Sequence, residues 1–101
     1  MNTSQQANKE AIIQQVAAVP VGEVTSYGAI AKAAGLPGYA RFVGHVLRNL
    51  PKDSKLPWHR VINAQGKLSF PPESDAYIEQ KKRLVNEGVV FKNDKVKLPH
   101  R

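Results

Sequence analysis

The sequence predicts a mainly α-helical fold with small β-hairpins, built around a helix-turn-helix. Three observations predict it: an apolar pattern with helical spacing near the N-terminus, two short helical segments separated by a turn that contains glycine, and a second half in which short β-like runs accompany one further helix. The chain has 101 residues, which suffices for one modest core and is too short for two. We therefore expect a single domain that spans residues 1–101.

The first helix is predicted over Ser4–Val19, because apolar side chains recur on one helical face and Pro20 cannot continue the helix. A short connection at residues 21–24 then leads to the second helix. The apolar side chains of the first helix are Ile12, Ile13, Val16 and Ala17.

Two further helices form the predicted helix-turn-helix. Thr25 and Ser26 are both suited to cap the second helix, which covers about Tyr27–Ala34. Gly35 fits the left-handed position that follows a helix, and a tight turn leads to a third helix over about Tyr39–Leu50.

The third helix has two distinct faces. A DNA-reading helix needs cationic side chains for the phosphates, and a place without a side chain where its axis comes close, here Gly44. The alternative is an ordinary solvated face whose glycine packs against a neighbour. We favour a winged-helix-like DNA-binding domain. The apolar face, expected to point into the core, is Val43, Val46, Leu47 and Leu50. The cationic face is Arg41, Gly44, His45 and Arg48, with Lys52 just beyond.

The second half of the chain is predicted to hold short strands and one helix. Residues 56–62 are expected to be a rigid loop that enters a strand, followed by a turn at 63–66, a returning strand at 67–69 and a proline-containing loop at 70–73. A small hairpin is expected over 89–98, around Asn93 and Asp94.

The last predicted helix lies between these strands, over Asp75–Glu87. Ser74 is its expected cap and Gly88 its terminator. Its inward side chains are expected to be Tyr77, Ile78, Leu84 and Val85.

The balance of charges indicates a polyanionic partner. Lysine and arginine number 15 against 8 aspartate and glutamate residues, and this net charge of +7 favours nucleic acid over solubility alone. No helix face suggests a membrane partner. The chain has no cysteine, and its three histidines lack metal-ligand spacing, so we expect no metal and no other cofactor. No secretory signal is visible, so we expect a cytoplasmic monomer, nucleoid-associated if the source is bacterial.

Residues 57–61, Pro-Trp-His-Arg-Val, resemble the active-site signature Pro-Cys-His-Arg-Val of the O6-alkylguanine-DNA alkyltransferases. Further family motifs recur in the same order at similar spacing, at residues 19–22, 25–31, 40–44 and 87–88. The resemblance covers about residues 12–90 and does not include the separate N-terminal domain of full-length transferases. With tryptophan at the cysteine position, the sequence looks like the alkyltransferase-like proteins.

This resemblance implies recognition without catalysis. Alkyl transfer in the family needs a thiolate, and the indole of Trp58 cannot replace it. The implied function is recognition of O6-alkylguanine in double-stranded DNA, by a minor-groove helix-turn-helix and nucleotide flipping into a pocket at Trp58. The bound lesion would then be marked for nucleotide excision repair proteins. The alternative is a lesion-independent helix-turn-helix DNA binder that acts in transcription or DNA architecture.

The resemblance also implies roles for single residues on the DNA. Arg41 would fill the gap left by the extruded nucleotide, Tyr27 would press on the neighbouring phosphate, and Gly44 would permit close approach. The predicted DNA-binding residues are Ser26, Tyr27, Tyr39, Ala40, Arg41, Gly44, His45 and Arg48.

Around the pocket, the backbone carbonyls of Trp58 and Val61 would accept from the guanine amino group. His59 and Glu87 align with the pair that activates the cysteine, and without a thiol they would make structural hydrogen bonds, as would Arg60. Residues 69–72 differ from the segment that closes the transferase pocket, so we expect a roomier pocket. The predicted lesion pocket is Tyr27, Pro57, Trp58, Val61 and Ser69. Asn49 is displaced by one residue from the family's Asn-Pro, so its hinge role is not carried over.

Overall fold

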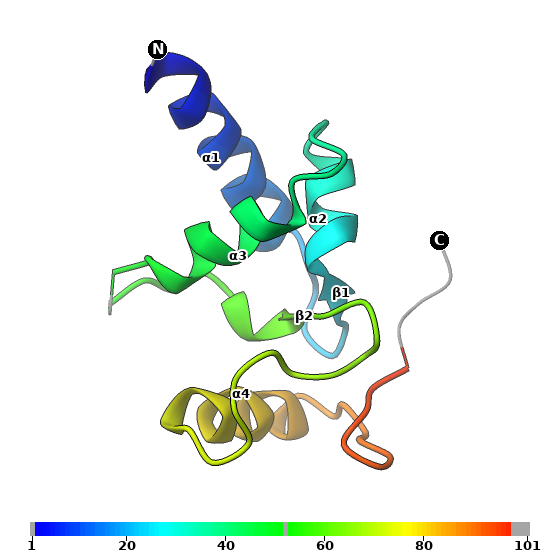
Figure 1. Cartoon of the computed structure of the whole chain (residues 1–101). Coiled ribbons are helices and arrows are strands. Elements are labelled where there is room, and N and C mark those ends of the chain that lie inside the picture. The colour runs from blue at the N-terminus through cyan, green and yellow to red at the C-terminus, as the bar shows by residue number, and fades with distance from the viewer. Residues whose placement is uncertain (1, 52, 98–101) are drawn as a thin grey trace.

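A two-stranded sheet lies between the first three helices and the fourth (Figure 1). The computed structural model describes residues 2–51 and 53–97. The expected mainly α-helical class with a helix-turn-helix and small β elements is confirmed. The helices are α1 (Asn2–Ala17), α2 (Tyr27–Ala33), α3 (Ala40–Arg48) and α4 (Asp75–Asn86), the strands are β1 (Thr25–Ser26) and β2 (Val61–Ile62), and a single 3₁₀ turn, η1, covers Trp58–Arg60.

Helix α1 begins and ends two residues before its predicted bounds. Ile12 and Val16 are fully buried, whereas Ile13 is partly buried and Ala17 is exposed, so the buried stripe is narrower than predicted. In the described part of the chain, no helix is both long and apolar enough to cross a bilayer.

The helix-turn-helix is formed by α2 and α3, which pack against each other (Figure 1). The Ser26 hydroxyl caps α2 by accepting from the Ala29 amide at 3.0 Å. At the other end, Gly35 has a φ of +79°, and the Leu36 amide donates to the Ala31 carbonyl at 2.8 Å. This reversal is a Schellman motif, in which glycine supplies the left-handed residue that redirects the chain toward α3.

The sheet differs from the predicted hairpin. Val61 and Ile62 of β2 pair in parallel with Thr25 and Ser26 of β1, and residues 67–69 are not a strand. The prediction of a returning strand was wrong. The turn is closed by backbone bonds from the Asn63 amide to the Lys67 carbonyl and from the Gly66 amide to the Asn63 carbonyl, but the Lys67 amide donates to the Asn63 side chain at 3.0 Å instead of to a neighbouring strand.

Strand β2 joins two hydrophobic clusters. Successive side chains of a strand point to opposite faces, so Val61 packs with the helices α1, α2 and α3 while Ile62 packs with Val24, Leu68 and Leu84. Both side chains are almost completely buried. The segment just before them, which contains Trp58, is therefore fixed from both sides.

Helix α4 begins at Asp75 as predicted, ends one residue before the predicted Glu87, and has a different buried face. Ser74 caps it by accepting from the Tyr77 amide at 3.2 Å, and Gly88 terminates it with a φ of +89°. Leu84 is buried as predicted, but Ile78 and Val85 are 56% and 53% exposed, so that part of the prediction was wrong. The place on the inward face is taken by a polar residue, Gln80, described below.

The predicted C-terminal hairpin is reduced to one antiparallel bridge between Lys92 and Lys95. Asn93 and Asp94 form its turn with φ values of +54° and +61°, the positive values of a two-residue hairpin loop. Val96 then donates from its amide to the Gly66 carbonyl at 2.8 Å, which ties the C-terminal segment to the turn after β2. Leu98, the last residue of the predicted hairpin, lies outside the described residues.

Candidate nucleic-acid interface

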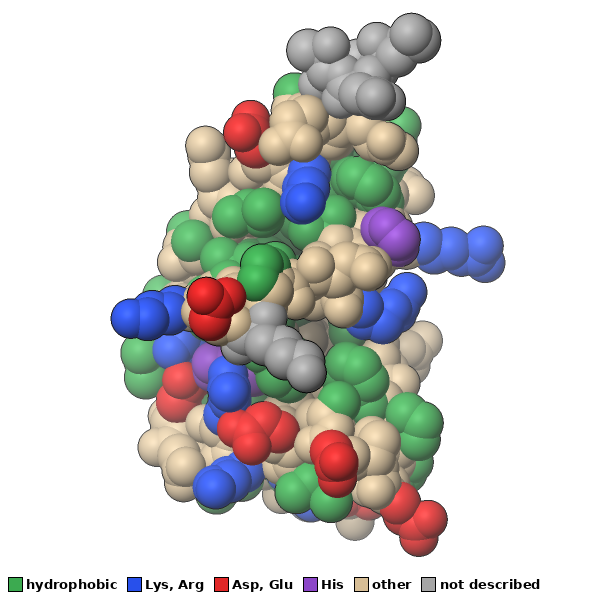
Figure 2. All heavy atoms as spheres, turned by 90° about the vertical axis from the view of Figure 1, so that its left-hand side faces the viewer, with side chains coloured by type: hydrophobic (Ala, Val, Ile, Leu, Met, Phe, Trp, Pro, Cys, Tyr) green, Lys and Arg blue, Asp and Glu red, His purple; other side chains and the backbone are tan. Residues whose placement is uncertain are grey.

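The outer side of α3 is a cationic ridge of three side chains, Arg41, His45 and Arg48, all of which are exposed. Lys52, which sequence analysis placed just beyond them, lies outside the described residues. Figure 2 shows that basic side chains project at the level of α3, whereas acidic side chains gather toward α4. The charge on this face is thus distributed unevenly, with α3 on its more basic part.

Gly44 does not leave bare backbone in the middle of that ridge, and this part of the prediction was wrong. The residue is buried, because side chains from neighbouring positions lie over it. A Cβ built on Gly44 would be 3.6 Å from Arg48 Nη1 and 4.0 Å from Tyr27 Cε1. Any close approach of another molecule to this glycine requires those two side chains to move.

Three other residues predicted to contact DNA lie around the ends of α2 and α3. Ser26 uses its hydroxyl for the cap described above, and Ala40 is the first residue of α3. Tyr39 is 46% exposed and meets the ring of Phe42 edge-on at 6.2 Å. An exposed aromatic ring held by a neighbour is a stiff contact surface beside the ridge.

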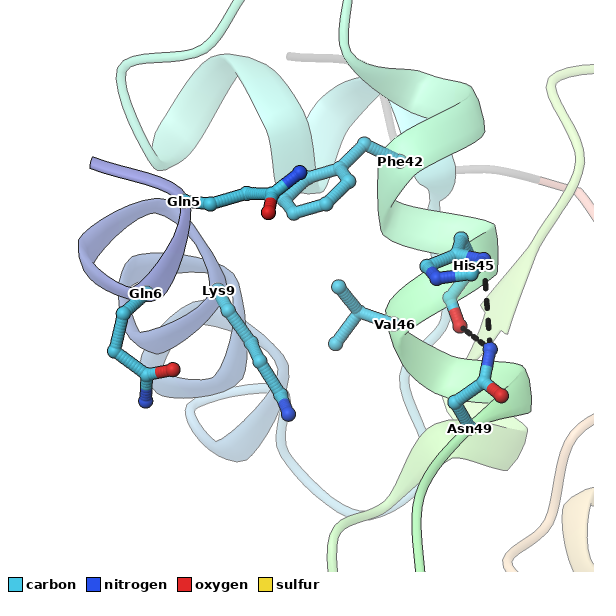
Figure 3. Close-up of a pocket in the computed structure, with 7 residues that line it drawn as sticks. All are labelled: Gln5, Gln6, Lys9, Phe42, His45, Val46 and Asn49. Carbon is cyan, nitrogen blue, oxygen red and sulfur yellow. Dashed lines mark hydrogen bonds between the residues drawn. The ribbon is translucent and has the colours of Figure 1, made fainter. Parts of the chain in front are cut away.

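A cavity of about 560 Å³ runs between α1 and α3 (Figure 3). His45 belongs both to this cavity and to the ridge, and its ring stacks on Phe42 with centroids 6.5 Å apart. Asn49 donates from its side-chain amide to the His45 carbonyl at 2.8 Å, which gives it a contact at the C-terminal end of α3. The residues that line the cavity are Gln5, Gln6, Lys9, Phe42, His45, Val46 and Asn49.

Trp58 is the first residue of η1 and is partly buried. Its indole meets the ring of Phe70 edge-on, with centroids 6.1 Å apart, and the guanidinium carbon of Arg83 lies 5.5 Å from its centroid. The indole therefore packs toward α4 and the loop before it. Sequence analysis missed Phe70 and Arg83, since nothing local links a loop phenylalanine or a helical arginine to position 58.

The predicted lesion pocket is not one of the two cavities described. Its members Tyr27, Pro57, Trp58, Val61 and Ser69 line neither the cavity at α1 and α3 nor a second one, of about 630 Å³, between α1, β1 and α2. The side chain of Val61 is buried in the core, and Ser69 is exposed.

Three charged or polar side chains clamp the loop that carries Trp58. Glu87 accepts from Arg60 through both oxygens, at 2.9 Å from Nε and 2.7 Å from Nη2, and from His59 Nε2 at 2.9 Å. Arg60 also donates from Nη1 to the Val19 carbonyl at 2.8 Å. The clamp joins the segment after α1, η1 and the end of α4. Its three side chains are those predicted to make structural hydrogen bonds, whereas the contact with the Val19 carbonyl was not predicted.

Electrostatics keep this clamp charged. Hydrogen bonds from Arg60, aided by His59 and opposed by burial, lower the pKa of Glu87 from 4.5 to about 2. The same hydrogen bonds raise the pKa of Arg60. A carboxylate can only accept, so the His59 ring carries a hydrogen on Nε2, and the buried Nδ1 has no hydrogen-bond partner among the described residues.

Gln80 is a site residue that the apolar pattern could not reveal. It is 1% exposed, and its amide nitrogen donates to the carbonyls of His59 at 3.2 Å and Val61 at 3.1 Å. The Trp58 carbonyl accepts from the Val61 amide. Both carbonyls that the resemblance assigns to guanine thus already have a protein partner, although each retains a second lone pair. In the described residues, no group of three or more histidine, aspartate or glutamate side chains is placed to hold a metal.

Comparison with known proteins identifies the family. Residues 7–89 match the model of the 6-O-methylguanine DNA methyltransferase, DNA binding domain. A DNA base-flipping protein of Vibrio parahaemolyticus is 53% identical over 79 residues, which cover 78% of this chain and 74% of that protein. Two longer bacterial relatives of the same name, from Escherichia coli and Shigella flexneri, are 50% identical, and the matched region covers 58% of each.

Two comparisons involve a fungal relative. Alkyltransferase-like protein 1 of Schizosaccharomyces pombe is 42% identical over 78 residues, covering 77% of this chain and 72% of that protein. The crystal structure of S. pombe Atl1 in complex with damaged DNA containing O6-carboxymethylguanine superimposes with a TM-score of 0.79 at 37% identity, over 91% of this chain and 88% of that one. This chain belongs to the family of 6-O-methylguanine DNA methyltransferase DNA-binding domains, and within it to the alkyltransferase-like proteins.

Proposed function

We propose that this protein binds double-stranded DNA that contains O6-alkylguanine, flips the modified nucleotide toward Trp58 and holds it without removing the alkyl group. The observation that carries the proposal is Trp58 within Pro-Trp-His-Arg-Val, where the family's transferases have cysteine, in a sequence with no cysteine at all. A relative whose structure was determined on DNA containing O6-carboxymethylguanine supports the choice of ligand.

The cationic ridge of α3 would enter the minor groove of the DNA. The exposure of the ridge supports this docking, and so do the residues that flank it. On one side lie Tyr27 and the start of α2, and on the other lies the cavity between α1 and α3. Lys9 and the side-chain amides of that cavity are suited to a phosphate backbone, since both kinds of group donate hydrogen bonds.

Arg41 and Tyr27 would then extrude the nucleotide. Arg41 is exposed at the first turn of α3, from which its planar guanidinium can reach into the base stack. Flipping costs a few kcal/mol and less for a weakened pair. O6-alkylation removes the N1 hydrogen of guanine, so the modified base would be cheaper to extrude than its normal counterpart.

Trp58 would supply the second part of the discrimination. A flipped base that stacks on an aromatic side chain gains about 1–3 kcal/mol. A base that stacks on the side of the indole where Phe70 lies would displace that ring, whose loop lies outside the regular helices and strands. His59 has no thiol to deprotonate, so the clamp with Glu87 would only hold the loop.

The bound complex would mark the lesion for nucleotide excision repair, with the protein acting as a monomer. Stable binding without chemistry leaves the damage in place, so another activity must complete the repair. Addition of purified excision-repair proteins to the complex on a lesion duplex should give a slower band in a gel-shift assay, and no such band on the unmodified duplex.

The first test is a titration of two duplexes that differ only in one O6-methylguanine, at equal salt, followed by the fluorescence of Trp58, the sole tryptophan. We expect tighter binding and a larger fluorescence change with the lesion duplex. Equal binding of both duplexes would favour the lesion-independent DNA binder instead. Mass spectra of protein and DNA after incubation should show no transferred methyl group.

Arg41→Ala tests the extrusion step. We expect it to weaken lesion binding by at least about 1 kcal/mol, because the gap in the base stack is left unfilled. Lys92→Ala removes the same charge from the C-terminal hairpin, away from α3, and should change the affinity little. Equal effects of the two substitutions would reduce the role of Arg41 to its charge.

A further inference from the structure

Helix α4 contacts the indole of Trp58 through one charged side chain, Arg83. The guanidinium carbon of Arg83 lies over the ring, 5.5 Å from its centroid, within the distance at which a cation is attracted to an aromatic face. Phe70 meets the indole at an interplanar angle of 90°. The ring of His59, next in the chain, also meets the indole at nearly a right angle, so contacts from α4, from the loop at Phe70 and from within η1 hold the indole.

The orientation of Arg83 is itself set by a neighbour on α4. Arg83 Nε donates to Glu79 Oε2 at 2.7 Å, and the two residues are one helical turn apart. The hydrogen bond from Arg83 lowers the pKa of Glu79, which keeps its carboxylate charged. Since Nε is the edge donor of a planar group, its bond to Glu79 restricts how the guanidinium plane can turn over the indole.

This ion pair adds little stability of its own. The side chains of Arg83 and Glu79 are 44% and 47% exposed, so solvent screens their attraction. Its consequence is geometric: an otherwise mobile arginine is held over the ring of Trp58. Lys82, the preceding residue, has the same charge but points about 100° away around the helix.

We propose that Arg83, oriented by Glu79, is a positioning residue that fixes the plane of Trp58 and thereby sets the preference for alkylated over normal guanine. This inference rests on the proposed function, in which the flipped base stacks on Trp58. A stacked base needs the indole in one orientation, because a ring that rotates gives up part of the contact area. The contacts with Arg83 over one face and with Phe70 at a right angle restrict that rotation before the DNA arrives.

The test uses the full chain with four substitutions: Arg83→Gln, Arg83→Lys, Glu79→Gln and the matched control Lys82→Gln. For each variant, the dissociation constants of an O6-methylguanine duplex and its unmodified twin are measured at equal salt, and their ratio is the preference. Acrylamide quenching of the single tryptophan, without DNA, reports the exposure of the indole. Far-UV circular dichroism verifies that each variant is folded.

We expect Arg83→Gln to reduce the preference about two- to five-fold, which is the size of an exposed cation–π contact. Quenching of Trp58 should increase in the same variant. Arg83→Lys should restore part of the preference and part of the protection from quenching. Glu79→Gln should change the preference and the quenching in the same direction as Arg83→Gln, but by less. Lys82→Gln should weaken the binding of both duplexes by the same factor, or the binding of neither, and should leave the quenching of Trp58 unchanged.

Two negative results have different meanings. If the natural sequence prefers the lesion and Arg83→Gln keeps that preference, the inference about Arg83 fails while the proposed function stands. If the natural sequence binds both duplexes equally, the proposed function fails, and the role of Arg83 in lesion preference fails with it.

Discussion

Replacement of Glu87 by glutamine should remove, already at neutral pH, most of the folding stability that the natural protein loses when it is acidified. Glu87 accepts three hydrogen bonds from Arg60 and His59, and its side chain is only 17% exposed. The lowering of its pKa from 4.5 to about 2 corresponds to roughly 3 kcal/mol of folding stability at neutral pH. For a domain of this length, that is a fall in Tm of roughly 12–24 °C.

The sign of the pH dependence follows from the direction of this change. A carboxyl whose pKa is lower in the folded protein contributes stability above pH 4.5, and loses it as the pH falls toward 2. The free energy of unfolding of the natural protein should therefore fall by roughly 3 kcal/mol over this interval. The Glu87→Gln variant should lack this contribution at every pH, including pH 7.

Urea denaturation followed by circular dichroism at several pH values between 2 and 7 would measure both curves. Glu79→Gln is the matched control, because it also removes a carboxylate paired with an arginine, and the Glu79 side chain is 47% exposed. In this control, the free energy of unfolding should fall in acid by nearly as much as in the natural protein. Parallel curves for the natural protein and Glu87→Gln would refute the reasoning, since some other group would then control acid stability.

Two further predictions concern the support of the site loop. Gly66→Ala should lower the free energy of unfolding by about 2–5 kcal/mol, because φ is +81° and a Cβ would meet the Val96 carbonyl. Gly35→Ala, with φ +79° and open space around it, should lower it by only about 1–2 kcal/mol. Equal urea midpoints for the two variants would contradict the clash. Gln80→Met should cost about 2–4 kcal/mol by leaving two loop carbonyls without their donor, and a Gln6→Met control on exposed α1 should leave the midpoint unchanged.

The ends of the helices could be predicted from the sequence because their signals are local. Ser26 and Ser74 cap α2 and α4 with their hydroxyls, and Gly35 and Gly88 adopt the left-handed backbone that ends them. Each signal involves residues within one helical turn, so no tertiary contact can override it easily.

Contacts between distant segments could not be predicted in the same way. The partner of Val61 is Thr25, and a two-residue strand has no pattern that distinguishes a parallel neighbour from a hairpin. The buried face of α4 was predicted wrongly because Gln80 points inward to donate hydrogen bonds to two loop carbonyls. A pattern of apolar residues cannot reveal a buried polar side chain.

The candidate site was predicted unevenly for a related reason. The resemblance identified Trp58, His59 and Glu87 one residue at a time, because motifs are read along the chain. The contacts of Arg83 and Phe70 with Trp58 exist only after α4 has folded back onto η1.

The arrangement around η1 has a consequence for how this fold can diversify. The hydrogen bonds and buried side chains that anchor the loop come from positions other than 58: the imidazole and guanidinium that follow it, the two side chains of β2 in separate cores, and the amide of Gln80. The indole of Trp58 adds packing contacts with Phe70 and Arg83, but none of these hydrogen bonds uses the side chain at position 58. A change of one codon from cysteine to tryptophan would leave those hydrogen bonds in place, and under the function proposed above it would turn a repair reaction into a binding event in one evolutionary step.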